Sequence, residues 1–590
     1  MSQTSRPSLA YLLVILLASV AAAQEPASVS NSSESRIITG RVVSDSGQPL
    51  AGASVFASIS TGPSNQRTAT DSEGNFKLQG LDAGLYRLSA SLPGYVFQSY
   101  QTDLNNVNAF YRPGESASLT LIKGGVIAGT ITSIEGQPVV SVSVRAFRVR
   151  DGEGNKVPSA TFSQPRMSDD RGYFRIYGLL PGTYLVSAGG PGQYFGSPNP
   201  YANDAPTYAP ASTRDTAAEF IVHSDQEVTA DIRYRGEPGH VVSGKISGAL
   251  PATPPPPGGL GVRLSDLDSH AVIASAQITG DDRAFQLNGV SDGEYEIIAL
   301  SASGAPNTDL SASPPRHLTV KGADVTGLVL TLAPLGSIAG RVVFETDPKL
   351  NCGRHRDNAQ RETMVVVRRD RVEEQPGNQK PKDKTDQEVE SVLFPRSVSS
   401  IPNERGEINF RNLTAANYRL EIRTPGAGWY VRDVNPGPSG PRAPANRAVA
   451  NLARNGIGVK GGERISGVTI AIAEGGAGFR GRVTTAEGQS VPPGLRVYLV
   501  PAEREHNDNV LRFFEGTVAG DGTFAIGNIA PARYWLIALP AETIDANTWK
   551  SVKTDGAWRA KVLHGAEAAK KEISFKPCER NGDYELPYSP

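Results

Sequence analysis

A phrase that returns five times along the chain limits what it can fold into more than any other feature. Each copy starts with a short alternating run of the type Ile-x-Gly-x-Val, at residues 38–43, 127–131, 242–246, 338–342 and 479–483. Each continues with a turn and a second alternating run, at residues 71–78, 169–174, 281–287, 403–410 and 520–526. Each then adds a run built on a tyrosine, at residues 84–90, 181–188, 293–297, 417–420 and 532–538. Repetition in a fixed order is the signature of tandem units of one fold.

Each part of the phrase has a local physical meaning. Alternation with period two is typical of a half-buried strand, and a glycine inside such a strand marks a bulge or a close approach of two backbones. An Asp-x-x-Gly sequence indicates a tight turn in which the carboxylate accepts a backbone N–H. A tyrosine directly after the next turn resembles the tyrosine corner of sandwich domains. A further alternating strand is expected to end each copy, at residues 118–121, 229–232, 328–332, 468–472 and 573–575.

Short strands and turn signals without a long helical period predict an all-β chain of five tandem antiparallel β-sandwiches, Ig-like or transthyretin-like. Glycine and proline, at 62 and 43 of 590 residues, stay below the share of about 25–30% that indicates disorder. We expect the units to be strung as a rod or a bent necklace. The predicted division is a signal peptide at 1–23, a linker at 24–36, unit 1 at 37–123, unit 2 at 124–236, unit 3 at 237–334, unit 4 at 335–474 with a charged insertion at 345–400, unit 5 at 475–578 and a tail at 579–590.

The copies resemble the carboxypeptidase regulatory-like domain family. The resemblance rests on Gly-x-Val, on Gly-x-Pro-Leu-x-Gly-Ala-x-Val at residues 47–55, on Asp-x-x-Gly-x-Phe and on Pro-Gly-x-Tyr. It implies a transthyretin-like, seven-stranded sandwich, a shape similar to the collagen-adhesin B-type and starch-binding-like sandwiches. In peptidases that carry such a domain, the sandwich lies beside the catalytic domain. The resemblance therefore implies a fold and no activity.

The N-terminus predicts export. Arg6 precedes the apolar run 9–23, which ends in small residues, so we expect a secretory signal peptide that is cut before Gln24. The alternative is an uncleaved anchor, although the run is shorter than the roughly 20 residues that a membrane span needs. No membrane span is expected once the signal is removed, and the predicted location is secreted, periplasmic or at the cell envelope. There a Cys352–Cys578 disulfide is chemically permitted, and two unpaired thiols are the alternative.

Composition and motifs argue against several functions. A formal net charge of −1 argues against nucleic acid as a partner. The spacing His564-x-x-Glu567 could offer two zinc ligands, but no third histidine follows it. No Gly-x-Ser-x-Gly elbow is present, and turn chemistry explains the acidic turns without calcium. The prediction is a protein that is not an enzyme and uses no cofactor or metal.

Aromatic residues in the loops are the candidate binding residues. Aromatic faces stack on the apolar faces of sugar rings. The alternative is that these rings pack over the ends of the sandwiches or between units. We predict a secreted, non-enzymatic binding protein with a glycan or a cell-surface protein as partner, carbohydrate favoured. The alternatives are a spacer or protein-interaction stalk at the cell envelope and, more remotely, an extracellular hydrolase or peptidase accessory protein. The candidate residues are Tyr95, Tyr100, Tyr111, Tyr194, Tyr201, Tyr208, Trp429, Trp549 and Trp558.

Overall fold

The fold was described from a computed structural model of the chain. The predicted signal peptide and residues 24–35 of the predicted linker lie outside the described residues. The structure describes residues 36–60, 65–97, 110–157, 165–191, 199–248, 259–268, 271–278, 281–301, 309–350, 352, 358–370, 397–436, 452–485, 490–545 and 548–588.

The chain is all-β, and in the described residues every unit repeats the same seven strands in two sheets. The first sheet is built around the opening strand of the repeat, which pairs antiparallel with the strand after the Asp turn and parallel with the last strand of the unit. The opening strands are β1 (Ile38–Ser44), β9 (Gly125–Thr132), β18 (His240–Gly248), β26 (Gly336–Glu345) and β34 (Ala477–Thr484). The strands after the Asp turn are β4 (Asn75–Leu78), β12 (Tyr173–Leu179), β21 (Ala284–Val290), β29 (Glu407–Leu413) and β37 (Thr523–Ile529). The last strands are β8 (Ser116–Lys123), β16 (Glu227–Thr229), β25 (Val325–Pro334), β33 (Arg464–Glu474) and β42 (Arg580–Pro587).

The second sheet is built around the second strand of each unit, which pairs antiparallel on both sides. The second strands are β2 (Ser54–Ile59), β10 (Ser143–Asp151), β19 (Leu260–Asp266), β27 (Met364–Arg369) and β35 (Leu495–Pro501). One neighbour is β3 (Asn65–Ala69), β11 (Arg166–Met167), β20 (Val272–Ile278), β28 (Ser397–Ser400) or β36 (Phe514–Thr517). The other is the tyrosine strand, β5 (Tyr86–Ser91), β13 (Gly182–Ala188), β22 (Gly293–Ser301), β30 (Ala416–Arg423) or β38 (Ala532–Pro540). The tyrosine strand also pairs with β7 (Phe110–Tyr111), β15 (Phe220–Val222), β24 (Arg316–Val320), β32 (Ile457–Val459) or β41 (Glu572–Phe575).

Further elements decorate individual units. In unit 3, β23 pairs with both β22 and β25 and so joins the two sheets. Unit 5 carries a helix of 14 residues, α2, that no helical period predicted. The short strands are β6 (Tyr95–Phe97), β14 (Thr207–Tyr208), β17 (Ile232–Arg233), β23 (Ser311–Ala312), β31 (Trp429–Asn435), β39 (Thr543–Asp545) and β40 (Thr548–Trp549). The helical elements are α1 (Leu452–Asn455), α2 (Gly556–Ala569), η4 (Arg214–Thr216), η5 (Arg504–His506) and η6 (Val510–Arg512).

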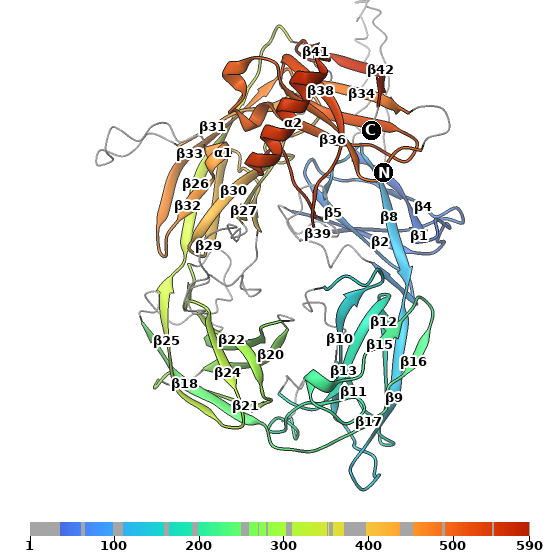
Figure 1. The fold of residues 1–590 in the computed structure, drawn as a ribbon, viewed down its shortest axis with the longest axis vertical. Helices are drawn as coiled ribbons and strands as arrows, with labels where there is room; N and C mark the ends of the chain where they lie inside the picture. The colour runs from blue at the N-terminus through green and yellow to red at the C-terminus, as the bar shows by residue number, and fades with distance from the viewer. Residues whose placement is uncertain are drawn as a thin grey trace, which may run out of the picture.

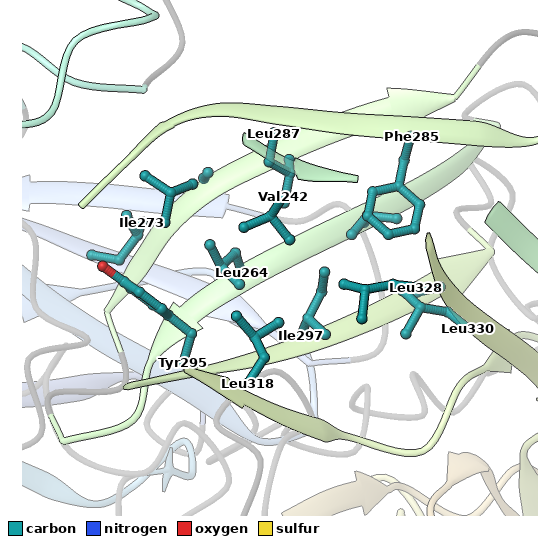
Figure 2. Close-up of a cluster of buried hydrophobic side chains, with 14 of the residues drawn as sticks. Val242, Leu264, Ile273, Phe285, Leu287, Tyr295, Ile297, Leu318, Leu328 and Leu330 are labelled. Carbon is teal, nitrogen blue, oxygen red and sulfur yellow. The ribbon is translucent and has the colours of Figure 1, made fainter. Parts of the chain in front are cut away.

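The alternating strands place one face of each sheet in a core between the sheets. Figure 2 shows this core in unit 3, where Val242 of the first sheet and Leu264 of the second point toward one another. Tyr295 and Phe285 close its two ends in the same view. Units 1, 2, 4 and 5 each have a separate cluster of the same kind. Each sandwich therefore buries its own apolar surface, which is the dominant stabilising term in folding.

The tyrosine corner that the sequence predicts is present in all five units. In each, the tyrosine hydroxyl donates a hydrogen bond to the carbonyl oxygen four residues earlier. Burial raises the pKa of Tyr184, Tyr295 and Tyr534 to about 12, so these hydroxyls remain protonated donors at neutral pH. The bonds are Tyr86 to Asp82 (3.0 Å), Tyr184 to Leu180 (2.7 Å), Tyr295 to Ser291 (2.8 Å), Tyr418 to Thr414 (3.0 Å) and Tyr534 to Ala530 (2.7 Å).

Replacing Tyr534 by Phe is expected to lower the free energy of unfolding of unit 5 by about 1–2 kcal/mol, because the buried carbonyl of Ala530 loses its donor. Tyr534 is fully buried and touches Phe514 and Phe575, and Phe preserves these contacts. Denaturation followed by tryptophan fluorescence measures the change, since Trp535 lies in the same strand. Equal stability of the variant and the parent would show that the hydroxyl contributes nothing.

Two predicted boundaries are wrong. Residues 345–400 are not an insertion throughout, because they contain β27, the second strand of unit 4, whose first four residues are buried. Residues 579–590 are not a tail, because β42 forms the last strand of unit 5 and pairs parallel with β34. The strand that we expected to end unit 5, at residues 573–575, belongs to β41 on the tyrosine strand instead.

The units do not form an extended rod. Figure 1 shows units 1 to 4 arranged as a ring, with unit 5 at the top of the view, above units 4 and 1, and the first sheet of units 1 to 4 on the outer side. Residues of unit 1 contact residues of unit 4, more than 200 positions later, so the ring is closed. The sequence left a rod and a bent necklace open, because sequence repeats do not encode the angle between neighbouring units.

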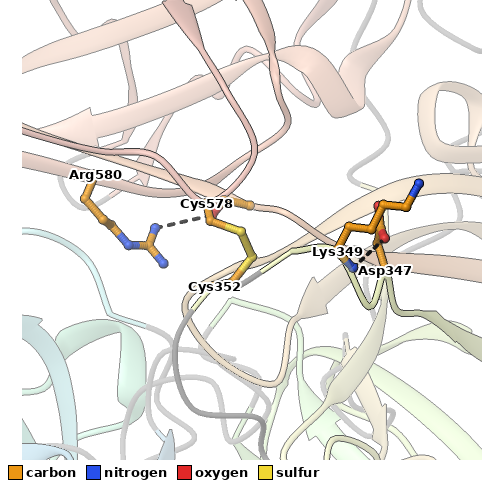
Figure 3. The surroundings of a disulfide bond; sticks show 6 residues. Asp347, Lys349, Cys352, Cys578 and Arg580 are labelled. Atoms are coloured by element: carbon orange, nitrogen blue, oxygen red, sulfur yellow. Dashed lines mark hydrogen bonds between the residues drawn. A yellow bond between two sulfur atoms is a disulfide. The ribbon is translucent and has the colours of Figure 1, made fainter.

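A disulfide ties unit 4 to unit 5. It joins Cys352 and Cys578, whose Cα atoms are 4.8 Å apart and which are separated by 226 positions. Figure 3 shows the bond beside Arg580, whose guanidinium donates to the carbonyl oxygen of Gly476 at 3.3 Å. Of the two alternatives that the sequence left open, the structure therefore shows the paired cysteines. A covalent link of this kind suits an oxidising compartment.

Candidate functional site

Three of the described aromatic candidates pack inside the protein. Tyr208, Trp429 and Trp558 are 4%, 7% and 3% exposed, so they cannot stack on a sugar. Tyr208 joins the core of unit 3, and Trp429 lies in the core of unit 4 with an edge-to-face contact to Phe344. Trp558 anchors α2 against the second sheet of unit 5. These three assignments to a glycan site are therefore wrong, because the rings serve the cores.

Three further candidates are half-buried. Tyr95 and Tyr111 pack against the core of unit 1. Tyr201 packs against the core of unit 2, donates a hydrogen bond to the carbonyl oxygen of Val140 at 2.7 Å, and meets the ring of Tyr234 edge to face. The packing alternative thus accounts for these rings.

For three candidates the structure does not describe the surroundings of the side chain. Tyr100 and Tyr194 lie outside the described residues. Trp549 lies in β40. The nine candidates are therefore not brought together into one described surface.

An exposed aromatic surface does exist on the outer face of the first sheet of unit 2. Tyr173 and Tyr177 of β12 are 36% and 56% exposed, and Arg175 lies between them on the same face. Phe174 and Ile176 alternate with them and are buried in the core. We call Tyr173, Arg175 and Tyr177, together with Glu227 of β16, the tyrosine face. At roughly 3.3 Å per strand residue, the two rings stand about 13 Å apart.

The register of the sheet explains how this surface is assembled. Tyr173 is paired with Thr130 of β9, Arg175 with Ala128 and Tyr177 with Val126. The strand β9 lies between β12 and β16. Its residue beside Arg175 is Ala128, whose side chain is small, so Arg175 reaches across β9 to Glu227, with Nη2 and Oε2 2.9 Å apart. The hydrogen bond that Arg175 donates to Glu227 raises the pKa of the guanidinium. The guanidinium is therefore a cation that lies between two rings on the same face.

A second arginine completes the aromatic end of this surface. The guanidinium carbon of Arg166, in β11, lies 4.3 Å from the centroid of the Tyr177 ring. A cation stacked on a ring is an attractive contact, and it holds Tyr177 in one orientation. Tyr177 keeps more than half of its surface exposed despite this contact. Ordered rings lose little entropy when a ligand binds them.

The corresponding face of unit 5 is polar instead. A depression of about 780 Å³ lies over β34, β37 and β42. Its outward side chains include Arg480, Arg482, Thr523, Asp583 and Glu585, whereas Phe524 and Tyr584 of the same strands belong to the core of unit 5. The faces of units 2 and 5 therefore differ in chemistry although their strands correspond.

Two other kinds of site were sought in the described part of the chain. It holds no group of three or more His, Cys, Asp or Glu side chains that could bind a metal ion. His564, which we considered as a zinc ligand, is exposed on α2. Within the same residues, no helix has both the length and the apolar character to span a bilayer.

Comparison with known proteins identifies the first unit. The family model of the carboxypeptidase regulatory-like domain matches residues 37–109. Unit 1 therefore carries a carboxypeptidase regulatory-like domain, as the resemblance implied. No curated protein matches the chain.

Solved structures similar to parts of the chain include bacterial pilins. The Bacillus anthracis TIE protein is 12% identical over 51% of this chain and 50% of its own, with a TM-score of 0.14. The minor pilin of Streptococcus agalactiae is 13% identical over 37% of this chain and 99% of its own, with a TM-score of 0.19. The shaft pilin SpaA of Lactobacillus rhamnosus GG is 12% identical over 37% and 99%, with a TM-score of 0.16. Scores this low say nothing about what the chain does.

Proposed function

We propose that the chain is a secreted, non-enzymatic carbohydrate-binding protein of the cell envelope, and that the tyrosine face of unit 2 is its binding surface. The observation that carries the proposal is the exposure of Tyr173 and Tyr177 on one face, with the cation of Arg175, paired with Glu227, between them. Soluble proteins bury most large aromatic side chains, and exposed aromatic groups on one surface mark interaction sites.

The chemistry of the surface suits a chain of sugar rings. The apolar face of a sugar ring can stack on Tyr173 and another on Tyr177, because both rings project from the same strand face. Arg175 and Glu227 offer donors and acceptors to hydroxyl groups between the two rings. A flat sheet face leaves the ends of the ligand open, which favours a site within a polysaccharide over one at its terminus.

The test is a glycan array probed with the mature chain, residues 24–590, and with Tyr173→Ala, Tyr177→Ala and Arg175→Ala variants. Each lost ring is expected to weaken binding about tenfold, from about 1–2 kcal/mol of lost contact. Phe56→Ala is the matched control, because Phe56 is 39% exposed beside Arg67 but is the one exposed aromatic side chain among the described residues of unit 1. It should leave binding unchanged.

Two results would contradict the proposal. If the folded chain binds no glycan, the spacer or protein-interaction stalk replaces the carbohydrate-binding protein. If glycan binding survives the double variant Tyr173→Ala/Tyr177→Ala, the tyrosine face is not the site. Far-ultraviolet circular dichroism of each variant distinguishes lost binding from lost folding.

A further inference from the structure

Unit 1 and unit 4 touch through a small apolar patch. Leu85 and Phe110 of unit 1 meet Met364 and Val366 of unit 4, and all four are at most 7% exposed. Phe110, Met364 and Val366 lie on the second sheets of the two units, on the faces that point away from the cores. Leu85 directly precedes β5. The patch is distinct from the core clusters of units 1 and 4.

A buried arginine crosses the same contact. The side chain of Arg112, in unit 1, is 8% exposed, and its Nη2 donates to the carbonyl oxygens of Glu362, at 3.3 Å, and of Thr424 in unit 4. Its Nη1 lies 3.1 Å from a carboxylate oxygen of Glu115, and its Nε lies 4.0 Å from one of Glu362. Arg423 of unit 4 reaches Glu115 at 3.5 Å. Two cations and two carboxylates thus alternate across the contact.

The joint between units 1 and 2 is much lighter. Gly124 alone separates β8 from β9, and the exposed ion pair Lys123–Asp225, at 2.6 Å, bridges the two units there. Among the described residues, no hydrophobic cluster contains members of both units. By contrast, units 2 and 3 share a cluster through Phe147, Leu185 and Tyr208, and the disulfide ties unit 4 to unit 5.

We propose that unit 1 is a hinged gate, with its hinge at Gly124 and its latch at Arg112. The closed ring is the latched state. When the latch breaks, unit 1 swings away from unit 4 as a rigid sandwich, and no strand has to unfold. Opening exposes the apolar patch that contains Phe110 and Met364. In the closed ring these side chains are buried.

The charged side chains decide whether unit 1 stays in contact with unit 4. A buried ion pair that loses one partner leaves the other charge without compensation in a site poor in water. Arg112 is the member with most partners, because it serves two carbonyl oxygens and two carboxylates. A carboxylate in its place would face Glu115 and Glu362 as well as the carbonyls, so every former attraction becomes a repulsion.

The test is small-angle X-ray scattering of the mature chain with Arg112→Glu and, from the other side of the contact, Met364→Asp. Both variants are expected to increase the radius of gyration and the largest dimension, while far-ultraviolet circular dichroism stays unchanged. Arg36→Glu is the matched control, because it breaks the exposed pair with Asp82 inside unit 1 and should leave the scattering curve unchanged.

Hydrogen exchange of the same samples decides whether unit 1 moves as a rigid body. The proposal requires faster exchange around residues 110–112 and 362–366 and parental protection in β1 and β8. Unchanged scattering in both folded variants would overturn the latch. Loss of protection in β1 and β8 would overturn the gate, because the contact would then be part of the fold of unit 1.

Discussion

Removal of residues 579–590 is expected to unfold unit 5 and to leave units 1 to 4 folded. The truncated chain keeps the Cys352–Cys578 disulfide but lacks β42, the parallel partner of β34. It loses Leu586, which is 1% exposed, and Tyr584, whose ring centroid lies 5.3 Å from that of Phe479. Two such side chains contribute about 1.5–3 kcal/mol each, and the lost ladder bonds add about 1 kcal/mol each. The sum is comparable to the whole stability of a domain, about 5–15 kcal/mol.

Hydrogen exchange read by mass spectrometry measures this effect unit by unit. Peptides from β34, β35 and β38 are expected to exchange at the rate of an unfolded chain in the truncated protein, with parental protection in units 1 to 3. Truncation after Tyr588 is the control, because it keeps β42 complete. Parental protection of β34 after truncation at Cys578 would show that the sandwich does not need its last strand.

The role of β42 was hidden by its local sequence. The strand reads Arg-Asn-Gly-Asp-Tyr-Glu-Leu-Pro, and Asn-Gly is a strong turn signal. Asp583 has a positive φ of 58°, and the pairing with β34 shifts register between Phe479 and Gly481, as at a bulge. Such an interruption breaks the period-two pattern that identifies strands. The alternating run 573–575 therefore took its place in the prediction.

The strand β27 was missed for a different reason. Its residues Met364 to Val367 are all buried and do not alternate. Val365 and Val367 face the core of unit 4, whereas Met364 and Val366 face unit 1. A strand that is covered on both faces reads as a continuous apolar run, and its second cover comes from a unit more than 200 positions away. Local pattern alone could not reveal that contact.

The fold class could be predicted because its signals are local. The turn before the second alternating run, the glycine of the opening strand and the tyrosine corner each depend on neighbouring residues. The glycine and the tyrosine corner recur five times. Tyr173 and Tyr177 also had a local signal, since they alternate with the core residues Phe174 and Ile176. The aromatic clusters in the loops were more conspicuous, but conspicuous rings such as Trp429 and Trp558 fill gaps between elements. Closure of the ring depends on angles between units, which no repeat encodes.

Replacing Gly481 by Ala is expected to destabilise unit 5 by about 3 kcal/mol or more. A Cβ atom at Gly481 would lie 2.2 Å from the carbonyl oxygen of Tyr584 and 2.8 Å from the ring of Phe524. Backbone of the parallel partner strand cannot move aside without breaking its ladder. The same approach recurs in every unit: the distance to the partner carbonyl oxygen is 2.1 Å at Gly40, 2.3 Å at Gly129, 2.1 Å at Gly244 and 2.4 Å at Gly340.

Gly527→Ala in β37 is the matched control. A Cβ atom there meets nothing within 4 Å, and its φ is not positive. Alanine at such a site restricts the unfolded chain and is expected to stabilise unit 5 by about 0.4–1 kcal/mol. The two substitutions add the same methyl group to the same sandwich, so their difference isolates the contacts with β42 and with the ring of Phe524. Denaturation followed by tryptophan fluorescence reports on units 4 and 5, where Trp429, Trp535, Trp549 and Trp558 all lie. If both variants change the midpoint equally, the glycine of the repeat is not required for the close approach of its two strands.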